Sequence, residues 1–358
     1  MTSRRHDAIV VGAGVIGLAS ATSIAARGMS VLLVGVPRPG EASPASAGML
    51  APSVERASGP AHDFAVAARE RYASYVEELA ETTGIRVPLN RLGVLQVALT
   101  EAGVRGLRRT AGPRVEWLDR AALSEMEPTL GHALGAFLNP DDGSIDNVAL
   151  LRALNVLAES SPTITRVHTA AESVDAGNDL ARVALTSGDT AEADCIVVAA
   201  GAWAGTLTGA LAAHVVQPVR GQLLSFAGIG LRHVVYGPRG YLVPRGTSET
   251  IAGSTMEYVG FDPVTTTQGI SRVRSAAEEI APALSVAPMM SAWAGLRPVT
   301  PDLLPIIGRD PRRATLIYAC GHSRNGILLA ALTGDVIAAL VANEPVTHDL
   351  SQFRPYRF

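Results

Sequence analysis

The 358-residue sequence contains no lysine, so all 30 of its basic residues are arginine. Catalysis through a lysine Schiff base is therefore excluded, and so is a Walker-type phosphate loop, which needs a lysine. Alanine is abundant as well, so a nucleotide bias in the gene explains the absence best. The missing lysine removes two classes of chemistry without pointing to a third.

Cysteine and charge are also scarce. The two cysteines, Cys195 and Cys320, lie in apolar stretches typical of strands, so we expect no structural disulfide and a reducing, cytoplasmic setting. Charged residues make up 18% of the chain and the formal net charge is −3, which indicates no surface for nucleic acid or anionic membrane. No metal ion is expected. A hydrophobic content of 47% over this length is sufficient for two domains with sizeable cores.

A glycine motif stands near the start of the chain, between an apolar run and an alanine-rich segment. Residues 7–17 read Asp-Ala-Ile-Val-Val-Gly-Ala-Gly-Val-Ile-Gly, and a second apolar run follows at 31–34. This order predicts the strand, tight turn, helix and strand of a dinucleotide-binding unit. Gly12 would make the turn, Gly14 would let the backbone approach a pyrophosphate, and Gly17 would let the helix pack closely on the sheet. The amides and the dipole at the helix start would then bind the phosphates.

The same stretch has features of a signal peptide or membrane helix, because residues 8–26 are uncharged and follow Arg4 and Arg5. Three glycines at fixed spacing are not typical of the apolar core of a signal peptide, and cleavage after them would remove the phosphate loop. A second apolar segment, 327–341, is interrupted by Asp335 and is short for a membrane span. We therefore expect neither a targeting segment nor an integral membrane segment.

Later patterns assign the chain to two domains of an α/β fold. Helices are predicted at 61–83, 101–109, 148–158 and 327–341, and strands at 92–99, 115–118, 166–169, 181–186, 193–203 and 315–319. The strand at 193–203 is buried and ends in glycine, as central parallel strands do, whereas the region from 215 to 256 is typical of an antiparallel sheet. The prediction is a Rossmann-like domain assembled from discontinuous segments, 1–90, 145–214 and 296–358, with a substrate domain of mostly antiparallel sheet from 91–144 and 215–295.

The acidic residue that usually ends the second strand, and binds an adenosine ribose, is absent. By spacing it would fall at Gly35, between Val34 and Val36, so NAD with the usual ribose contact is disfavoured. NADP would call for a nearby arginine, and Arg38 lies beyond Pro37. The identity of the dinucleotide therefore depends on the rest of the chain.

Four more motifs follow the glycine loop in order. They are Ser-Pro-Ala-Ser-Ala-Gly-Met-Leu at 43–50, Ile-Val-Val-Ala-Ala-Gly-Ala-Trp at 196–203, Trp-Ala-Gly-Leu-Arg-Pro-Val-Thr-Pro-Asp at 293–302 and Gly-His-Ser-Arg-Asn-Gly-Ile-Leu at 321–328. With them the chain resembles the D-amino-acid-oxidase-like FAD family over essentially its full length, and within it most the glycine oxidases associated with thiamine biosynthesis. The resemblance implies FAD on a glutathione-reductase-type domain. It also implies oxidation of a small amino acid or amine, such as glycine, sarcosine or a small D-amino acid, with oxygen as acceptor.

The resemblance also implies site residues. Arg297 would bind the substrate carboxylate through the bidentate geometry that arginine provides, and Tyr241 would hydrogen-bond that carboxylate or close the pocket. Met256 would line the pocket, and Arg324 would contact substrate, flavin or both. A hydride would leave the substrate Cα for the flavin N5. Flavin contacts are implied for Gly12, Gly14, Val15, Ile16, Gly17, Gly35, Val36, Ala42, Ser43, Ala47, Gly48, Met49, Val174, Gly201, His322, Arg324, Asn325, Gly326, Ile327 and Leu328.

Sarcosine oxidases of the same superfamily attach flavin through a cysteine just after the position of Arg297 and activate oxygen with a lysine. Residues 298–302 contain no cysteine, so noncovalent FAD is expected. Without lysine, either Arg297 or Arg324 assists oxygen, or the enzyme is a dehydrogenase that passes electrons to a quinone. A flavoprotein subunit with purely structural FAD is a third alternative, against which the set Arg297, Tyr241 and Arg324 argues. The sequence leaves a homo-oligomer open.

Overall fold

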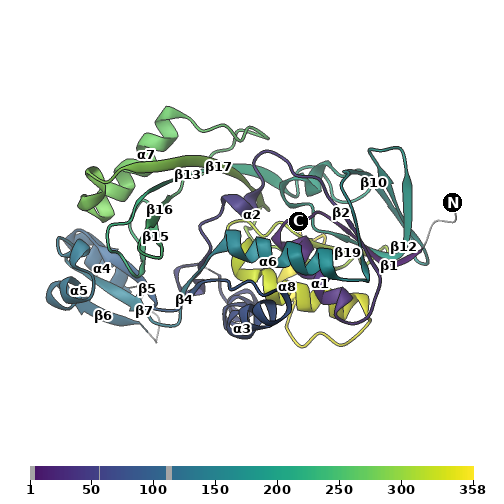
Figure 1. Ribbon diagram of the computed structural model, residues 1–358, viewed down its shortest axis with the longest axis horizontal. Helices are drawn as coiled ribbons and strands as arrows, with labels where there is room; N and C mark the ends of the chain where they lie inside the picture. The colour runs from purple at the N-terminus through teal and green to yellow at the C-terminus, as the bar shows by residue number, and fades with distance from the viewer. Residues whose placement is uncertain (1–4, 56, 110–114) are drawn as a thin grey trace.

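The computed structural model describes residues 5–55, 57–109 and 115–358, and Figure 1 shows two large sheets toward opposite ends of the molecule with helices between and around them. The helices are α1 (Val15–Ala25), α2 (Ala42–Ala45), α3 (Pro60–Thr83), α4 (Glu101–Arg109), α5 (Arg120–Met126), α6 (Asn147–Ser160), α7 (Thr267–Ile280) and α8 (Gly326–Val341).

The first sheet has a parallel centre in the order β9-β2-β1-β12-β19. Antiparallel strands β11 and β10 continue from β12, and β18 pairs with β19. The strands are β1 (His6–Val11), β2 (Val31–Val34), β9 (Ile164–Val167), β10 (Ala171–Ala176), β11 (Ala181–Leu185), β12 (Thr190–Val198), β18 (Ile306–Arg309) and β19 (Leu316–Cys320). The glycine motif therefore lies at the centre of this sheet, where β1 ends.

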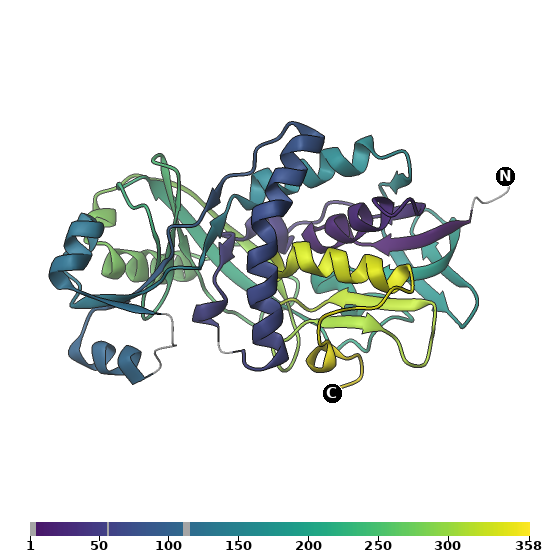
Figure 2. The same ribbon diagram turned by 90° about the horizontal axis from the view of Figure 1, so that it is seen from below.

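Both faces of the parallel centre are buried, which explains why its strands are apolar throughout. Because successive side chains alternate between faces, Ala8 and Val10 pack on α1, α3, α6 and α8, whereas Ile9 and Val11 pack against β10 and β11. Figure 2 shows the long helix α3 passing beside α8.

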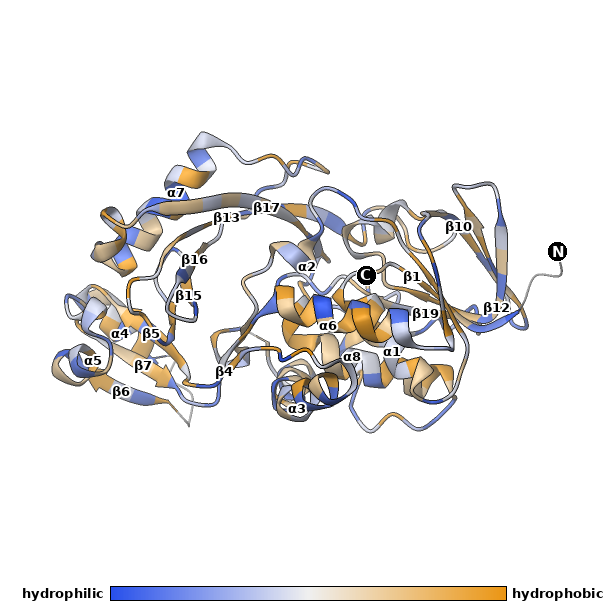
Figure 3. Cartoon of the chain, viewed as in Figure 1, coloured by the Kyte–Doolittle hydropathy of each residue, from blue (hydrophilic) through white to orange (hydrophobic). Residues whose placement is uncertain are grey.

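Helices α1 and α8 pack closely because of one glycine. A Cβ at Gly334 would lie 2.7 Å from the carbonyl oxygen of Ala19, so even alanine would push the two helices apart. Most of α8 is buried, and Figure 3 shows strongly hydrophobic segments among the helices around it. Within the described part of the chain, every helix is too short or too polar to cross a membrane.

The second sheet has the order β17-β13-β16-β15-β14-β5-β7-β6 and is antiparallel except for the pair β14–β5. Helix α7 packs on it through Val273, Ala277 and Ile280. Its strands are β5 (Val94–Ala98), β6 (Glu116–Asp119), β7 (Gly135–Asn139), β13 (Gln217–Ala227), β14 (Val234–Tyr236), β15 (Tyr241–Arg245), β16 (Glu249–Gly253) and β17 (Met289–Val299), and a small third sheet contains β3 (Met49–Leu50), β4 (Leu89–Asn90) and β8 (Gly143–Ile145). The predicted fold class is confirmed. The domain limits stay a prediction. Strand β17 (Met289–Val299) continues across the predicted boundary between residues 295 and 296.

Candidate active site

A cavity of about 930 Å³ lies along the carboxyl ends of the parallel strands. The ends of β1, β2, β12 and β19 form one side of it, and residues of β13, β15 and β17 from the second sheet form another. Ligands of open parallel sheets bind at this edge, where loops leave the strands. The two sheets thus contribute to a single site.

At one end of the cavity, the glycine motif is shaped by close backbone contacts. Gly12 has φ +114°, and a Cβ there would lie 2.3 Å from the carbonyl oxygen of Ala199. A Cβ at Gly17 would lie 1.8 Å from the carbonyl oxygen of Gly12, so this glycine brings the helix onto the turn. A Cβ at Gly14 would meet only Ser43 Oγ, at 3.2 Å. Packing therefore requires Gly12 and Gly17, whereas Gly14 leaves space at the cavity wall.

The start of α1 is arranged to receive an anion. Its first turn has no acidic residue, and its N-cap residue, Gly14, has no side chain to cap it. Ser43 Oγ accepts the N–H of Val15 at 3.1 Å. The free amides and the helix dipole favour negative charge at this position. Together with the volume of the cavity, this arrangement fits the pyrophosphate of a dinucleotide.

The missing acidic residue at Gly35 has a steric explanation. A Cβ there would lie 2.7 Å from Ala13 Cβ and 2.9 Å from Ala13 N, so the strand end packs directly against the glycine loop. The same cavity wall carries Glu41, which the sequence analysis missed. Its Oε1 accepts the N–H of Arg38 at 3.0 Å, and burial raises the pKa of its carboxyl. The cavity thus has a carboxylate in this region, supplied from six residues further along the chain.

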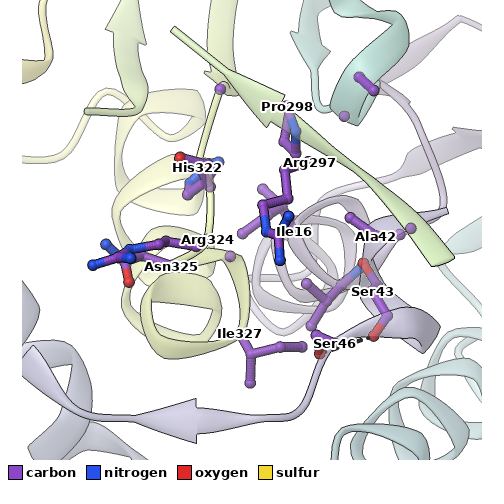
Figure 4. Close-up of a pocket in the computed structure, with 18 of the residues that line it drawn as sticks. Ile16, Ala42, Ser43, Ser46, Arg297, Pro298, His322, Arg324, Asn325 and Ile327 are labelled. Carbon is purple, nitrogen blue, oxygen red and sulfur yellow. Dashed lines mark hydrogen bonds between the residues drawn. The ribbon is translucent and has the colours of Figure 1, made fainter. Parts of the chain in front are cut away.

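At the other end of the cavity, Arg297 projects from β17 between the segment of Arg324 and that of Ser43 (Figure 4). Its Nη1 donates to the carbonyl oxygen of Thr255 at 3.0 Å, and its Nη2 donates to Ser254 Oγ at 2.6 Å. Burial lowers the pKa of Arg297 below its usual value, but arginine remains charged at neutral pH. Within the described residues no carboxylate pairs with this guanidinium, so its charge is available to a ligand.

Two glycines make room for this end of the site, and the sequence analysis identified neither. A Cβ at Gly221, on the adjacent strand β13, would lie 2.0 Å from Arg297 Nη1. A Cβ at Gly253 would lie 2.4 Å from the hydroxyl oxygen of Tyr241. Cross-strand contacts of this kind depend on register, which a single sequence does not specify.

Arg324 has a partner that the sequence analysis did not anticipate. Its Nε and Nη2 donate to Oε2 of Glu55, at 3.0 and 2.9 Å, and both residues line the cavity. Glu55 follows a 3₁₀ turn (Pro52–Val54), which places it opposite the start of α8. Arg324 therefore reaches the site as one half of an ion pair.

His322 lies beside Arg324 in the chain and is fully buried. Burial lowers the pKa of His322 to about 3, and its Nε2 lies 3.4 Å from Thr333 Oγ1. Because burial disfavours the charged imidazolium, His322 stays neutral at this position and does not act as a general base. Cys320 is also on the cavity wall, where burial raises the pKa of its thiol to about 12 and leaves it protonated.

Most of the residues named from the sequence line the cavity. These are Gly12, Gly14, Val15, Ile16, Gly35, Val36, Ala42, Ser43, Ala47, Gly48, Met49, Gly201, Tyr241, Met256, Arg297, His322, Arg324, Asn325, Gly326 and Ile327. Gly17, Val174 and Leu328 do not line it, and the N–H of Val174 donates to the carbonyl oxygen of Thr208 at 2.8 Å. Contact of each residue with cofactor or substrate stays a prediction. No three His, Cys, Asp or Glu side chains of the described ranges gather as metal ligands would.

The fold and the site define a flavin-dependent class of enzyme. Residues 7–340 match the model of the FAD dependent oxidoreductase family, and the chain belongs to that family. The chain is thus an FAD-dependent oxidoreductase, and the glycine loop, the start of α1 and the cavity fit this cofactor.

Particular relatives narrow the comparison. The chain is 34% identical to the glycine oxidase of Geobacillus kaustophilus over 98% of this chain and 97% of that protein. The crystal structure of that glycine oxidase matches with a TM-score of 0.92 at 32% identity, covering 99% of each chain. Iminodiacetate oxidase from Chelativorans sp. matches with a TM-score of 0.88 at 26% identity, covering 97% of this chain and 98% of that one.

The chain is also 34% identical to the bifunctional protein ThiO/ThiG of Synechocystis sp. over 98% of its own length. The chain spans about half the length of that relative, because the match covers 54% of the bifunctional protein.

Proposed function

We propose that this protein oxidises a small amino acid or amine that carries one carboxylate, such as glycine, sarcosine or a small D-amino acid. The observation that carries the proposal is the buried guanidinium of Arg297, which has no carboxylate partner among the described residues and lies in the same cavity as the glycine loop. A protein that held FAD only for structure would not need an unpaired buried charge there. The similarity to glycine oxidase supports the same proposal.

In this proposal the residues of the chain bind and orient the substrate. Arg297 binds its carboxylate through two parallel hydrogen bonds, and Tyr241, whose ring lines the cavity beside Arg297, adds a third contact. This binding would hold the substrate Cα in one orientation, and the chemistry that bound FAD would supply is hydride acceptance from Cα. His322 does not act as a base because it is neutral and buried, so the amine must arrive deprotonated. The product is an imine, which water hydrolyses to a 2-oxo acid and ammonia, or methylamine where the substrate is sarcosine. Hydrogen peroxide forms as well when oxygen is the acceptor.

The test is anaerobic mixing of the FAD-loaded protein with glycine, sarcosine and small D-amino acids, followed by absorbance in the visible flavin band. Bleaching by at least one of these compounds is expected. A flavin that stays oxidised with all of them would contradict the proposal and favour structural FAD. Readmitting oxygen, or adding a quinone, to the bleached enzyme then identifies the acceptor, since only oxygen yields hydrogen peroxide.

A further inference from the structure

The substrate end of the cavity contains two arginines whose electrostatic situations differ. Among the described residues, the hydrogen-bond partners of Arg297 are neutral, and they include the Thr255 carbonyl and the Ser254 hydroxyl. Arg324 donates two hydrogen bonds to the same carboxylate oxygen of Glu55. Both guanidinium groups line one cavity, and the positive charge of Arg324 contributes to lowering the pKa of Arg297. Glu55 therefore neutralises the charge of Arg324 before a ligand binds, whereas the charge of Arg297 is not neutralised by a described carboxylate.

Glu55 is well placed to keep Arg324 neutralised. Its side chain is 15% exposed, whereas that of Arg324 is 49% exposed, so the carboxylate is the more buried member of the pair. Because the carboxylate is mostly withdrawn from water, salt screens its attraction for the half-exposed Arg324 less than it would screen two fully exposed charges. Both hydrogen bonds from Arg324 end on Oε2 of Glu55, so none of the hydrogen bonds of this pair uses Oε1, and both residues line the shared cavity.

We propose that Glu55 selects for substrates with a single carboxylate. Arg297 supplies one carboxylate site, and the Glu55–Arg324 pair denies a second one. A ligand with two carboxylates would place its second negative charge beside Glu55, and like charges brought together are a recognised device for excluding the wrong ligand. This inference rests on the proposed function, because it takes Arg297 as the carboxylate site.

The direct test compares ligands that are bound but not oxidised. FAD-loaded protein is titrated with acetate and with malonate, and dissociation constants are read from the change in the visible flavin spectrum. In Glu55→Gln, which keeps the size of the side chain and removes its charge, we expect the affinity for malonate relative to acetate to rise about tenfold or more. The matched control is Glu344→Gln, which removes the same charge from the exposed Arg27–Glu344 pair and should leave the ratio unchanged.

A second readout uses turnover. Glycine and iminodiacetate, which is glycine with a second carboxymethyl group, are compared by kcat/KM in the wild-type protein and in Glu55→Gln. The ratio is expected to shift toward iminodiacetate by a similar factor, mainly through KM. If the role of Glu55 were purely structural, Glu55→Gln would lower kcat/KM for glycine and for iminodiacetate by the same factor.

The outcomes are distinguishable. If acetate does not bind the wild-type protein, the proposed carboxylate site fails and this inference fails with it. If acetate binds but the malonate-to-acetate ratio is the same in Glu55→Gln and wild type, only the inference is overturned. Should Glu55→Gln not fold, Arg324→Met provides the opposite test, because it leaves Glu55 unopposed. Malonate must then bind less well relative to acetate, and an unchanged ratio would overturn the proposal.

Discussion

Gly221 on β13 and Arg297 on β17 are diagonal neighbours on adjacent strands, and they approach so closely that a Cβ on Gly221 would lie 2.0 Å from Arg297 Nη1. The guanidinium therefore occupies the space that a side chain on β13 would fill. The carboxylate-binding geometry proposed for Arg297 depends on this glycine, because any side chain there would displace the guanidinium.

Gly221→Ala should displace Arg297 and lower kcat/KM for glycine by about ten- to a hundredfold, the scale of losing one charge-assisted hydrogen bond. FAD content should stay at the wild-type level, because the glycine loop is untouched. Gly103→Ala is the control, since a Cβ there would lie no closer than 3.4 Å to another atom of the described residues and alanine suits helix α4. Equal activity of the two variants would show that Arg297 does not need its present position.

Arg297→Lys should retain positive charge but lose the paired hydrogen bonds, which costs about 1.5–3 kcal/mol and lowers kcat/KM about ten- to over a hundredfold. Arg297→Ala should cost more. Steady-state kinetics with an amine that lacks a carboxylate provide the control, because its turnover should change far less. Equal losses with both substrates would mean that Arg297 supports the fold or the flavin instead.

Gly14→Val should abolish FAD binding while leaving the protein folded, because its side chain would enter the cavity beside Ser43 and hold the pyrophosphate away. Gly17→Val should unfold it instead, since a Cβ there would lie 1.8 Å from a backbone oxygen. Circular dichroism and the flavin spectrum separate the two effects. A Gly14→Val protein with normal flavin content would show that this loop does not contact the phosphates.

The FAD should be released completely by acid precipitation. Residues 298–302 contain no cysteine, and the cysteine on the cavity wall, Cys320, is kept protonated by burial that raises its pKa to about 12. The measurement is flavin absorbance in the supernatant and in the washed pellet. Yellow colour that remains with the pellet would indicate a covalent bond.

His322 should make the protein less stable in mild acid. Burial lowers the pKa of His322 to about 3 in the folded state, whereas an exposed histidine in the unfolded chain has a pKa of 6.5, so the unfolded chain binds more protons between these two values. Above pH 6.5 His322 does not lower the free energy of unfolding. Below that pH the free energy of unfolding decreases, and at pH 5 the loss from this group is about 2 kcal/mol. Urea unfolding at pH 7 and pH 5 measures the difference, and His322→Gln should reduce it by that amount. An unchanged difference in His322→Gln would contradict the burial argument.

Elements with strong local patterns could be predicted from the sequence. The helix expected at 61–83 is α3 (Pro60–Thr83), and the one at 327–341 is α8 (Gly326–Val341). Helix α7 (Thr267–Ile280) was not predicted, although its buried residues recur at helical spacing, because no element was assigned between residues 256 and 315. Long periodic segments are the easiest to identify, and their ends vary by a residue or two.

The site was less accessible to sequence reasoning, for a physical reason. Glu41 reaches the cavity through a loop with two prolines, and Glu55 meets Arg324 across 269 positions of the chain. Gly221 is needed only because of the strand register that puts Arg297 beside it. None of these relationships leaves a local pattern, because each depends on which segments the fold brings together.

The contact between Gly334 and Ala19 links distant parts of the cofactor cavity. Helix α1 begins at the glycine loop and α8 begins beside Arg324 and Asn325, so the close approach that Gly334 allows contributes to the spacing of the two helix starts. A single added methyl group at position 334, remote from any ligand, would alter that spacing. Substitutions in the buried interface between α1 and α8 can thus change the affinity for the cofactor. A variant that loses flavin therefore need not carry its substitution in the cavity.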